Sequence, residues 1–359
     1  MPTKVPAGDA VTKRSMFSWS YWQEGGKDTS RSEIVRNLGL LAVGIVGLVF
    51  GIWRAYTAHT QAKASAKQAE TGAQVHVTSS FTAAVEQLGN KQLPVRMGGI
   101  YALWRLAEDS PERHTVTVID ILCAFARNPP HGPATSLQLA TRKKTKAGNK
   151  QTKDSGPNVI PRLRSDVQAI LTLIGRNSKY RKYLSENYRL NFQSADLSLA
   201  DLRETEFNGA DLGGAIFFAA FLTDANLEKV NLIRANLEGA YLDRANLIHA
   251  DLRSAVMARC SLVNACLIVA DLAGTNLRWA NLYRANLEGA NLEGANLEGA
   301  NLEGANLERV NLGGANLLGV AGLTQKQLNT AYIAGGKEPP MLPPGFDAST
   351  IYIARTSGD

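Results

Sequence analysis

The chain has 359 residues, of which 45% are hydrophobic, 20% charged and 7% aromatic. This composition excludes a disordered chain, a disulfide scaffold and a multi-span transporter, and three cysteines are too few for a disulfide framework or a zinc site. The net charge of +7 combines unlike parts, because residues 1–189 carry +14, residues 190–319 carry −7 and residues 320–359 balance to zero.

The first expected element is a transmembrane helix at residues 38–56, after an N-terminal tail of residues 1–37. Residues 38–53 are an uncharged run of 16 residues, which spans roughly 24 Å at about 1.5 Å per residue. Trp53 and Tyr56 suit the membrane interface, where aromatic side chains gather. A buried helix of a soluble protein is the alternative interpretation.

Gly47 and Gly51 form a Gly-x-x-x-Gly pair, which allows two membrane helices to approach closely. They are the candidate seam of a homodimer. Lys and Arg are equally numerous on the two sides of the apolar run, so charge does not set its orientation. The unpaired cysteines and the basic stretch at 142–153 favour a single span of the bacterial inner membrane, with the C-terminal domains in the cytoplasm.

Residues 57–127 are expected to form a helical stalk and a small group of helices. Ser110-Pro111 is a typical start for a helix that runs to Arg127, because serine favours the N-cap and proline the first turn. The stretch from Val95-Arg96-Met97-Gly98-Gly99 to Arg127 resembles a HEAT-type helical pair. That resemblance implies packing and docking rather than chemistry.

Residues 128–161 form a basic linker with five prolines, expected to be disordered and able to contact anionic lipid headgroups at ~1 kcal/mol per charge. A solvated loop is the alternative. Residues 162–189 are expected to form a helix and the N-terminal cap of the next region. Ser165 and Gln168 predict a capping box, and Tyr180, Tyr183 and Tyr188 are expected to cover the first coil.

From Leu190 to Gly319 the chain repeats every five residues, in 26 units. The central residue is Leu in 22 units, Phe in three and Met in one, and the residue two before it is Ala in 20. A period of five fits neither a helix nor a strand but fits a solenoid with one short side per unit. The central residue and the small residue before it are expected to point inward, and the other three outward.

This Ala-(Asp/Asn)-Leu-x-x pattern resembles the pentapeptide-repeat family along residues 190–319. The resemblance implies a right-handed quadrilateral β-helix with four sides per coil, about 6.5 coils and roughly 31 Å long. The expected fold is therefore mainly a β solenoid with an N-terminal transmembrane helix and a small α-helical domain. HEAT-like segments precede the repeats in many membrane-anchored bacterial members.

Residues 320–359 are expected to form a C-terminal capping helix and a tail. Thr324 and Gln327 have the spacing of a capping box. The helix that they start is expected to run to Tyr332 and to stop at Gly335-Gly336, since glycine favours helix C-termini.

The sequence offers no support for catalysis, cofactor binding or metal binding. It lacks a phosphate loop, a nucleophile elbow and a His-Glu-x-x-His motif. Some pentapeptide-repeat proteins resemble DNA and bind type II topoisomerases, which makes a DNA-mimicking inhibitor the first alternative function. The four sides sum to only −2, −1, −2 and −2, far below the density of about one charge per 1.7 Å in DNA, and direct nucleic-acid binding is not expected.

Outward apolar residues on two neighbouring sides predict a protein-contact patch. Its members are Ile216, Phe218, Phe221, Tyr241, Val256, Val263, Trp279 and Tyr283. Scattered surface residues, or a surface covered by the basic linker, are the alternatives. The sequence therefore predicts a non-enzymatic, membrane-anchored scaffold whose rigid β-helix contacts an unidentified protein partner, with a purely structural spacer as the second alternative.

Overall fold

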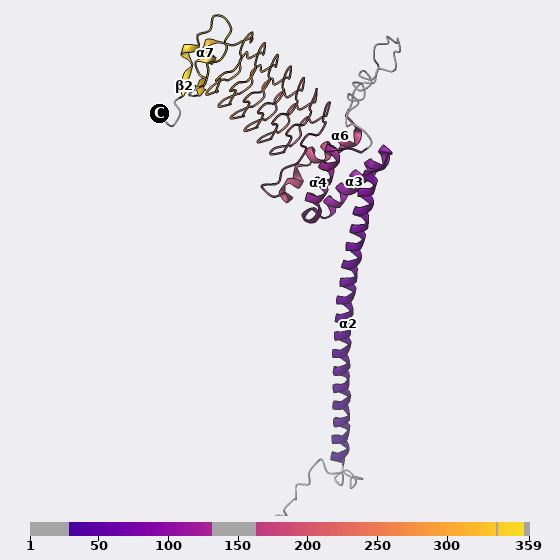
Figure 1. The fold of residues 1–359 in the computed structure, drawn as a ribbon. Helices are drawn as coiled ribbons and strands as arrows, with labels where there is room; N and C mark the ends of the chain where they lie inside the picture. Colours follow the sequence, from indigo (N-terminus) through magenta and orange to yellow (C-terminus); the bar gives the residue numbers. More distant parts are fainter. Residues whose placement is uncertain (1–28, 131–162, 335–336, 355–359) are drawn as a thin grey trace, which may run out of the picture. The chain divides into compact units, whose positions relative to one another are not determined.

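The computed structural model describes residues 29–130, 163–334 and 337–354 (Figure 1). It divides the chain into two compact units, residues 1–76 and 77–359. Most of the expected N-terminal tail and most of the expected basic linker, including its basic stretch at 142–153, lie outside the described residues.

Helix α2 is a single helix of 60 residues, Thr29–Leu88. It begins nine residues before the apolar run, so residues 29–37 are helical rather than part of a tail. The expected span and stalk are one continuous element, about 90 Å long at 1.5 Å per residue. Among the described residues this helix alone is long and apolar enough to cross a membrane, with a window of mean hydropathy 2.0 whose side chains are all exposed.

Three helices pack together ahead of the repeats: α3 (Leu93–Asp109), α4 (Pro111–Arg127) and α6 (Ser165–Arg176). Each contributes fully buried apolar side chains, among them Leu103, Leu122 and Ile170. Ser110 is the N-cap residue of α4, as predicted, but its side chain makes no capping hydrogen bond. The HEAT-type resemblance stays a prediction.

The predicted capping box of Ser165 and Gln168 is wrong. Helix α6 has Arg164 as its N-cap residue and no side-chain capping bond. The Gln168 side chain instead donates from Nε2 to the Asp201 carbonyl at 2.8 Å and accepts from the Asp201 N–H at 2.9 Å. The Gln168 amide thus makes the two hydrogen bonds that the backbone of a preceding coil would make to Asp201. Its side chain takes the place of a backbone rung above the first coil.

The 3₁₀ helix η1 (Ser178–Tyr183) connects α6 to the repeats. Tyr180 donates to Glu108 at 2.8 Å and packs edge-on against Trp104, while Tyr188 donates to Asp120 at 2.7 Å. These two tyrosines therefore bind α3 and α4, and Tyr180 also lines a small hollow together with Leu190 of the first coil. Arg181 contacts the coil, since it donates to the backbone carbonyls of residues 206 and 208.

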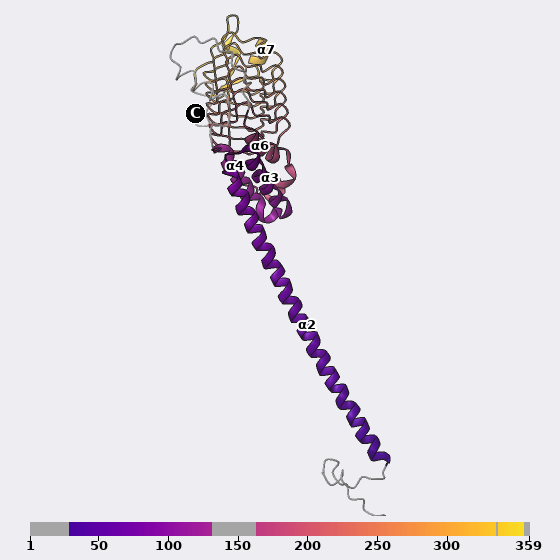
Figure 2. The ribbon, with the colours of Figure 1, turned by 90° about the vertical axis from the view of Figure 1, so that its right-hand side faces the viewer.

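The repeats form a rod of stacked coils between α6 and α7 (Figures 1 and 2). Parallel bridges join residues 20 apart, from Asn191–Asp211 to Asn301–Ala321. Twenty residues make four units, so each coil has four sides, as the resemblance implied. We name the faces by their first units: face A starts at residue 190, face B at 195, face C at 200 and face D at 205.

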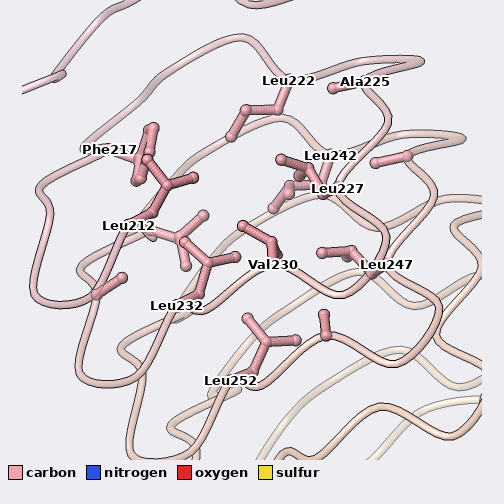
Figure 3. Packing of buried hydrophobic residues seen from close by; sticks show 14 of the residues in the cluster. Leu212, Phe217, Leu222, Ala225, Leu227, Val230, Leu232, Leu242, Leu247 and Leu252 are labelled. Carbon is pink, nitrogen blue, oxygen red and sulfur yellow. The ribbon is translucent and has the colours of Figure 1, made fainter. Parts of the chain in front are cut away.

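Side chains converge inside each coil (Figure 3). The 26 central residues are at most 2% exposed, and the small residues two before them are equally enclosed, apart from slightly greater exposure at Leu190 and Ala305. Where threonine replaces alanine, its hydroxyl is satisfied: Thr205 donates to the Leu202 carbonyl and Thr275 to the Leu252 carbonyl. The interior is therefore filled by one large and one small residue per side, as predicted.

Each side ends in a turn whose geometry the sequence reasoning did not address. The residue two after the centre has a positive φ in all 26 units, and glycine occupies only ten of these positions. A left-handed conformation costs a non-glycine residue roughly 1–2 kcal/mol. Val269 (φ 55°) and Trp279 (φ 59°) are bulky examples.

The C-terminal cap differs from the prediction. The capping box of Thr324 and Gln327 is present, but α7 (Gln325–Leu328) has only four residues and does not reach Tyr332. Residues 332–334 form strand β1, which pairs in parallel with β2 (Tyr352–Ala354), after the 3₁₀ helix η2 (Ala348–Thr350). Tyr332 bridges Asn311, so the open edge of the last coil recruits this segment as a further rung.

A buried ion cluster joins the helices. Asp166 is fully buried and pairs with Arg96 at 2.6 Å and with Arg164 at 2.5 Å. Burial raises the pKa of Asp166, but the hydrogen bonds and charges of Arg164 and Arg96 outweigh it and hold the pKa below its usual value. The carboxylate is therefore ionised in the folded protein well into the acid range.

We expect Asp166→Asn to destabilise residues 77–359 by about 3–5 kcal/mol at pH 7, because two guanidinium groups lose their buried counter-charge. Since the folded pKa lies below the unfolded one, the wild-type advantage is complete above about pH 5 and disappears as the pH falls through the folded pKa. Thermal unfolding of the full chain in detergent between pH 7 and pH 3 measures this difference.

Asp224→Asn is the matched control, because Asp224 pairs with Arg244 on the exposed surface. It should leave the melting temperature unchanged. A pH-independent difference for Asp166→Asn would contradict the assignment of an ionised Asp166.

Candidate functional site

The aromatic pair of Phe221 and Tyr241 is the best-formed part of the predicted patch. The two residues are joined by a parallel bridge on face C, so the coil period places their rings one above the other. Their centroids lie 5.3 Å apart with an interplanar angle of 5°. Phe221 is 41% exposed and Tyr241 45%, so the stacked rings face solvent.

The other predicted residues are less concentrated. Phe218 is half-buried on face B, across the corner from Phe221. Ile216 and Val256 share a column of face B but are separated by Asn236, which bridges both. The structure therefore does not join these two into one apolar surface.

Val263 and Tyr283 occupy the same position of face C in consecutive coils and are half-buried. The Arg284 guanidinium lies 5.0 Å from the centre of the Tyr283 ring. Both residues lie further along face C than the aromatic pair, and a polar residue, Ser261, follows Tyr241 in its own column.

Trp279 is the most exposed of the predicted residues, at 58%. Its indole lies on the bare backbone of Gly299 in the next coil, where a Cβ would overlap the ring. Trp279 also has a positive φ that favours glycine. Because every unit has a positive φ at this position, the feature particular to Trp279 is a large apolar side chain that is exposed to solvent.

Ion pairs surround the aromatic pair and neutralise much of its acidic neighbourhood. Arg203 pairs with Asp201 at 2.8 Å, and Arg244 pairs with Asp224 at 2.5 Å. The guanidinium partners hold the pKa of both carboxyl groups below the usual value. The Arg203 guanidinium also lies 6.0 Å from the Phe221 ring centre.

Two exposed apolar residues of the rod were missed by the sequence reasoning, Val269 on face D and Leu318 on face B. Val269 is 50% exposed and follows the half-buried Ile268. For Val269 the signal was present in the register, because every residue two after a centre lies at a corner of the coil. Face D therefore carries a smaller apolar surface of its own.

The described residues show no group of three or more His, Cys, Asp or Glu side chains that could hold a metal. Burial raises the pKa of the Cys123 thiol to about 12 and raises that of Cys260 as well, so neither is a ready nucleophile. An open hollow of about 630 Å³ lies near Arg176 and Glu204, with a lining of both charge signs.

Residues 189–217, 220–259, 260–299 and 280–319 match the family model described as pentapeptide repeats, in 8 copies. The rod is therefore built of pentapeptide repeats. Proteins of this family are generally non-enzymatic structural or binding proteins. The matched residues are those of the rod, whose 20-residue bridges and filled interior agree with the assignment.

Among solved structures, the chain is similar to HetL from the cyanobacterium Nostoc sp. strain PCC 7120, a pentapeptide repeat protein involved in heterocyst differentiation regulation (31% identity, 40% of this chain, 84% of that chain, TM-score 0.18). It is similar to Rfr23 from the cyanobacterium Cyanothece 51142 (30% identity, 41% of this chain, 93% of that chain, TM-score 0.14). It is also similar to QnrB1, a plasmid-mediated fluoroquinolone resistance protein (21% identity, 46% of this chain, 82% of that chain, TM-score 0.24). A search of curated proteins found no match.

Proposed function

We propose that this pentapeptide repeat protein is a non-enzymatic scaffold, anchored in a membrane by α2, whose rod presents an aromatic surface to a protein partner. We call this surface the aromatic corner; it comprises Phe218, Phe221 and Tyr241. The observation that carries the proposal is the exposed stack of Phe221 and Tyr241. Stacked aromatic side chains in solvent add nothing to the filled interior, and such residues dominate binding at protein interfaces.

The rod holds this surface in a fixed geometry. Two backbone hydrogen bonds join Phe221 to the preceding coil, with its N–H donating to the Ala200 carbonyl at 2.9 Å and its carbonyl accepting from the Leu202 N–H at 2.8 Å. A surface that is already ordered loses little conformational entropy when a partner binds. The rod is therefore a suitable platform for a stable contact.

Helix α2 supports the membrane part of the proposal. Its apolar run is fully exposed, and no other described residue covers it. We place α2 as a single span of the bacterial inner membrane with the rod in the cytoplasm. A Cβ on Gly47 or Gly51 would meet no atom within 4 Å, so no contact inside the chain requires glycine there, which is compatible with a seam between two helices.

The DNA-mimic alternative is less favoured by the charges of the rod. Arg259 pairs with Glu238 at 3.5 Å and Arg278 with Glu298 at 2.9 Å, so ion pairs interrupt the acidic surface on face B as they do on face C. A structural spacer is the remaining alternative, and a spacer does not need the aromatic corner to contact a partner. Crosslinking from membranes separates a scaffold from a spacer.

We expect the triple variant Phe218→Ser, Phe221→Ser and Tyr241→Ser to keep its fold and to lose at least about tenfold in partner affinity, because hot-spot aromatics contribute 2 kcal/mol or more. Crosslinking and mass spectrometry in membranes identify the partner, and co-purification with the full-length chain measures the loss.

The matched control changes Ile233, Ile248 and Ile268 to Ser, which removes outward apolar side chains from faces A and D. This variant should bind the partner as the wild type does. Equal binding by the aromatic variant would remove the corner from consideration, and inhibition of gyrase supercoiling by the full chain would favour the DNA mimic.

We expect Gly47→Leu with Gly51→Leu to weaken self-association of the full chain in detergent by about tenfold or more, because the leucines prevent close approach of two helices. Ile45→Leu with Val49→Leu, on the opposite side of α2, should have no such effect. Analytical ultracentrifugation in detergent measures both, and unchanged association of the glycine variant would exclude the seam.

A further inference from the structure

Both ends of the segment 131–162 are held at one place. Arg164 Nη1 donates to the carbonyl of Pro130 at 2.8 Å. The same guanidinium pairs with the buried Asp166, which also pairs with Arg96. The 32 residues of the segment therefore leave and rejoin the folded part of the chain beside the first turn of α6.

This place lies at the head of face C. Gln168 follows Arg164 by one helical turn and makes two hydrogen bonds to the Asp201 backbone. Asp201 bridges Phe221, which bridges Tyr241. At about 5.4 Å per turn and about 4.8 Å per rung, the aromatic pair lies within roughly 20 Å of Arg164, while half the segment can extend to about 50 Å.

The charges of the segment and of face C are complementary. The segment carries seven Lys or Arg residues and one acidic residue, Asp154. On face C, Arg203 and Arg244 are already paired, but Glu204 and Asp243 form no ion pair with any described residue. These two carboxylates flank the aromatic pair, one in the coil before Phe221 and one in the coil of Tyr241.

The segment also carries apolar side chains next to its charges. Leu137 and Leu139 lie a few residues before the basic run at 142–146. Face C has matching features, with an apolar pair flanked by acidic groups. Because the segment is tethered, its effective concentration at the corner is on the order of millimolar, so a weak contact is enough to populate the bound form.

We propose that the aromatic pair on face C is the docking surface for the chain's own residues 131–162, whose leucines contact the rings and whose basic run contacts Glu204 and Asp243. A partner of the aromatic corner then competes with this segment. The inference does not require the proposed scaffold function, since the contact forms within one purified chain.

The test uses the purified full chain in detergent, with the photoreactive residue p-benzoylphenylalanine in place of Tyr241. Cross-linked peptides are mapped by mass spectrometry in the monomeric fraction. We expect cross-links into residues 131–162 with at least about fivefold the yield obtained from the same probe at Ile233, which lies outward on the opposite face A. Lys143→Glu, Lys144→Glu and Lys146→Glu should reduce the yield to that of the control position.

The corresponding Lys→Arg triple variant keeps the charge and should retain the cross-links. Equal yields from the two probe positions, or a yield that charge reversal does not change, would overturn the proposal. Cross-links from residue 241 that join two copies of the chain in the dimeric fraction, with none into residues 131–162 in the monomeric fraction, would also overturn it. Failure of the partner-binding assay would leave these results unchanged, so the two proposals fail separately.

Discussion

The rod depends on the convergence of side chains inside each coil. One large and one small residue from each of four sides fill the interior, and backbone hydrogen bonds at a 20-residue spacing hold successive coils together. Because the interior is close-packed and takes one large and one small residue per side, the register is kept along all 26 units. The same register decides which outward side chains lie above one another, including Phe221 and Tyr241.

The helices ahead of the repeats hold the first coil in this register. Gln168 gives Asp201 the hydrogen bonds that a preceding coil would give, and the Asp166 cluster fixes the start of α6 on which Gln168 stands. At the other end, β1 continues the column that ends at Asn311. Both ends of the solenoid are thus closed by hydrogen bonds, which a repeat array needs in order to remain soluble.

The sequence predicted the solenoid well because its rule is local: a five-residue period can be read without knowing any distant contact. The number of sides came from resemblance, and the bridges confirm it. The wrong predictions concern residues whose hydrogen-bond partners lie far away in the sequence. The amide of Gln168 was assigned to its own helix because Asp201 lies 33 residues away, and Tyr332 was assigned to α7 because the edge at Asn311 could not be seen.

The candidate site was only partly predictable for the same reason. The column of Phe221 and Tyr241 follows from the period, so their proximity was foreseeable, whereas the separation of Ile216 from Val256 depends on which residue lies between them. The buried pair of Arg96 and Asp166 joins residues 70 apart and left no local signal. The sequence signal for the positive φ at each corner was the glycine found at ten of the 26 corner positions.

The most direct measurement of the central claim uses a cysteine that the chain already has. Cys266 is half-buried and bridges Asn246, so Asn246→Cys places two thiols on adjacent rungs, at about 4.8 Å, within the range of a disulfide. Mild oxidation should link residues 246 and 266 and leave Asp251→Cys, which lies on face A, unlinked to Cys266. A link in the Asp251 variant, or none in the Asn246 variant, would contradict the four-sided coil.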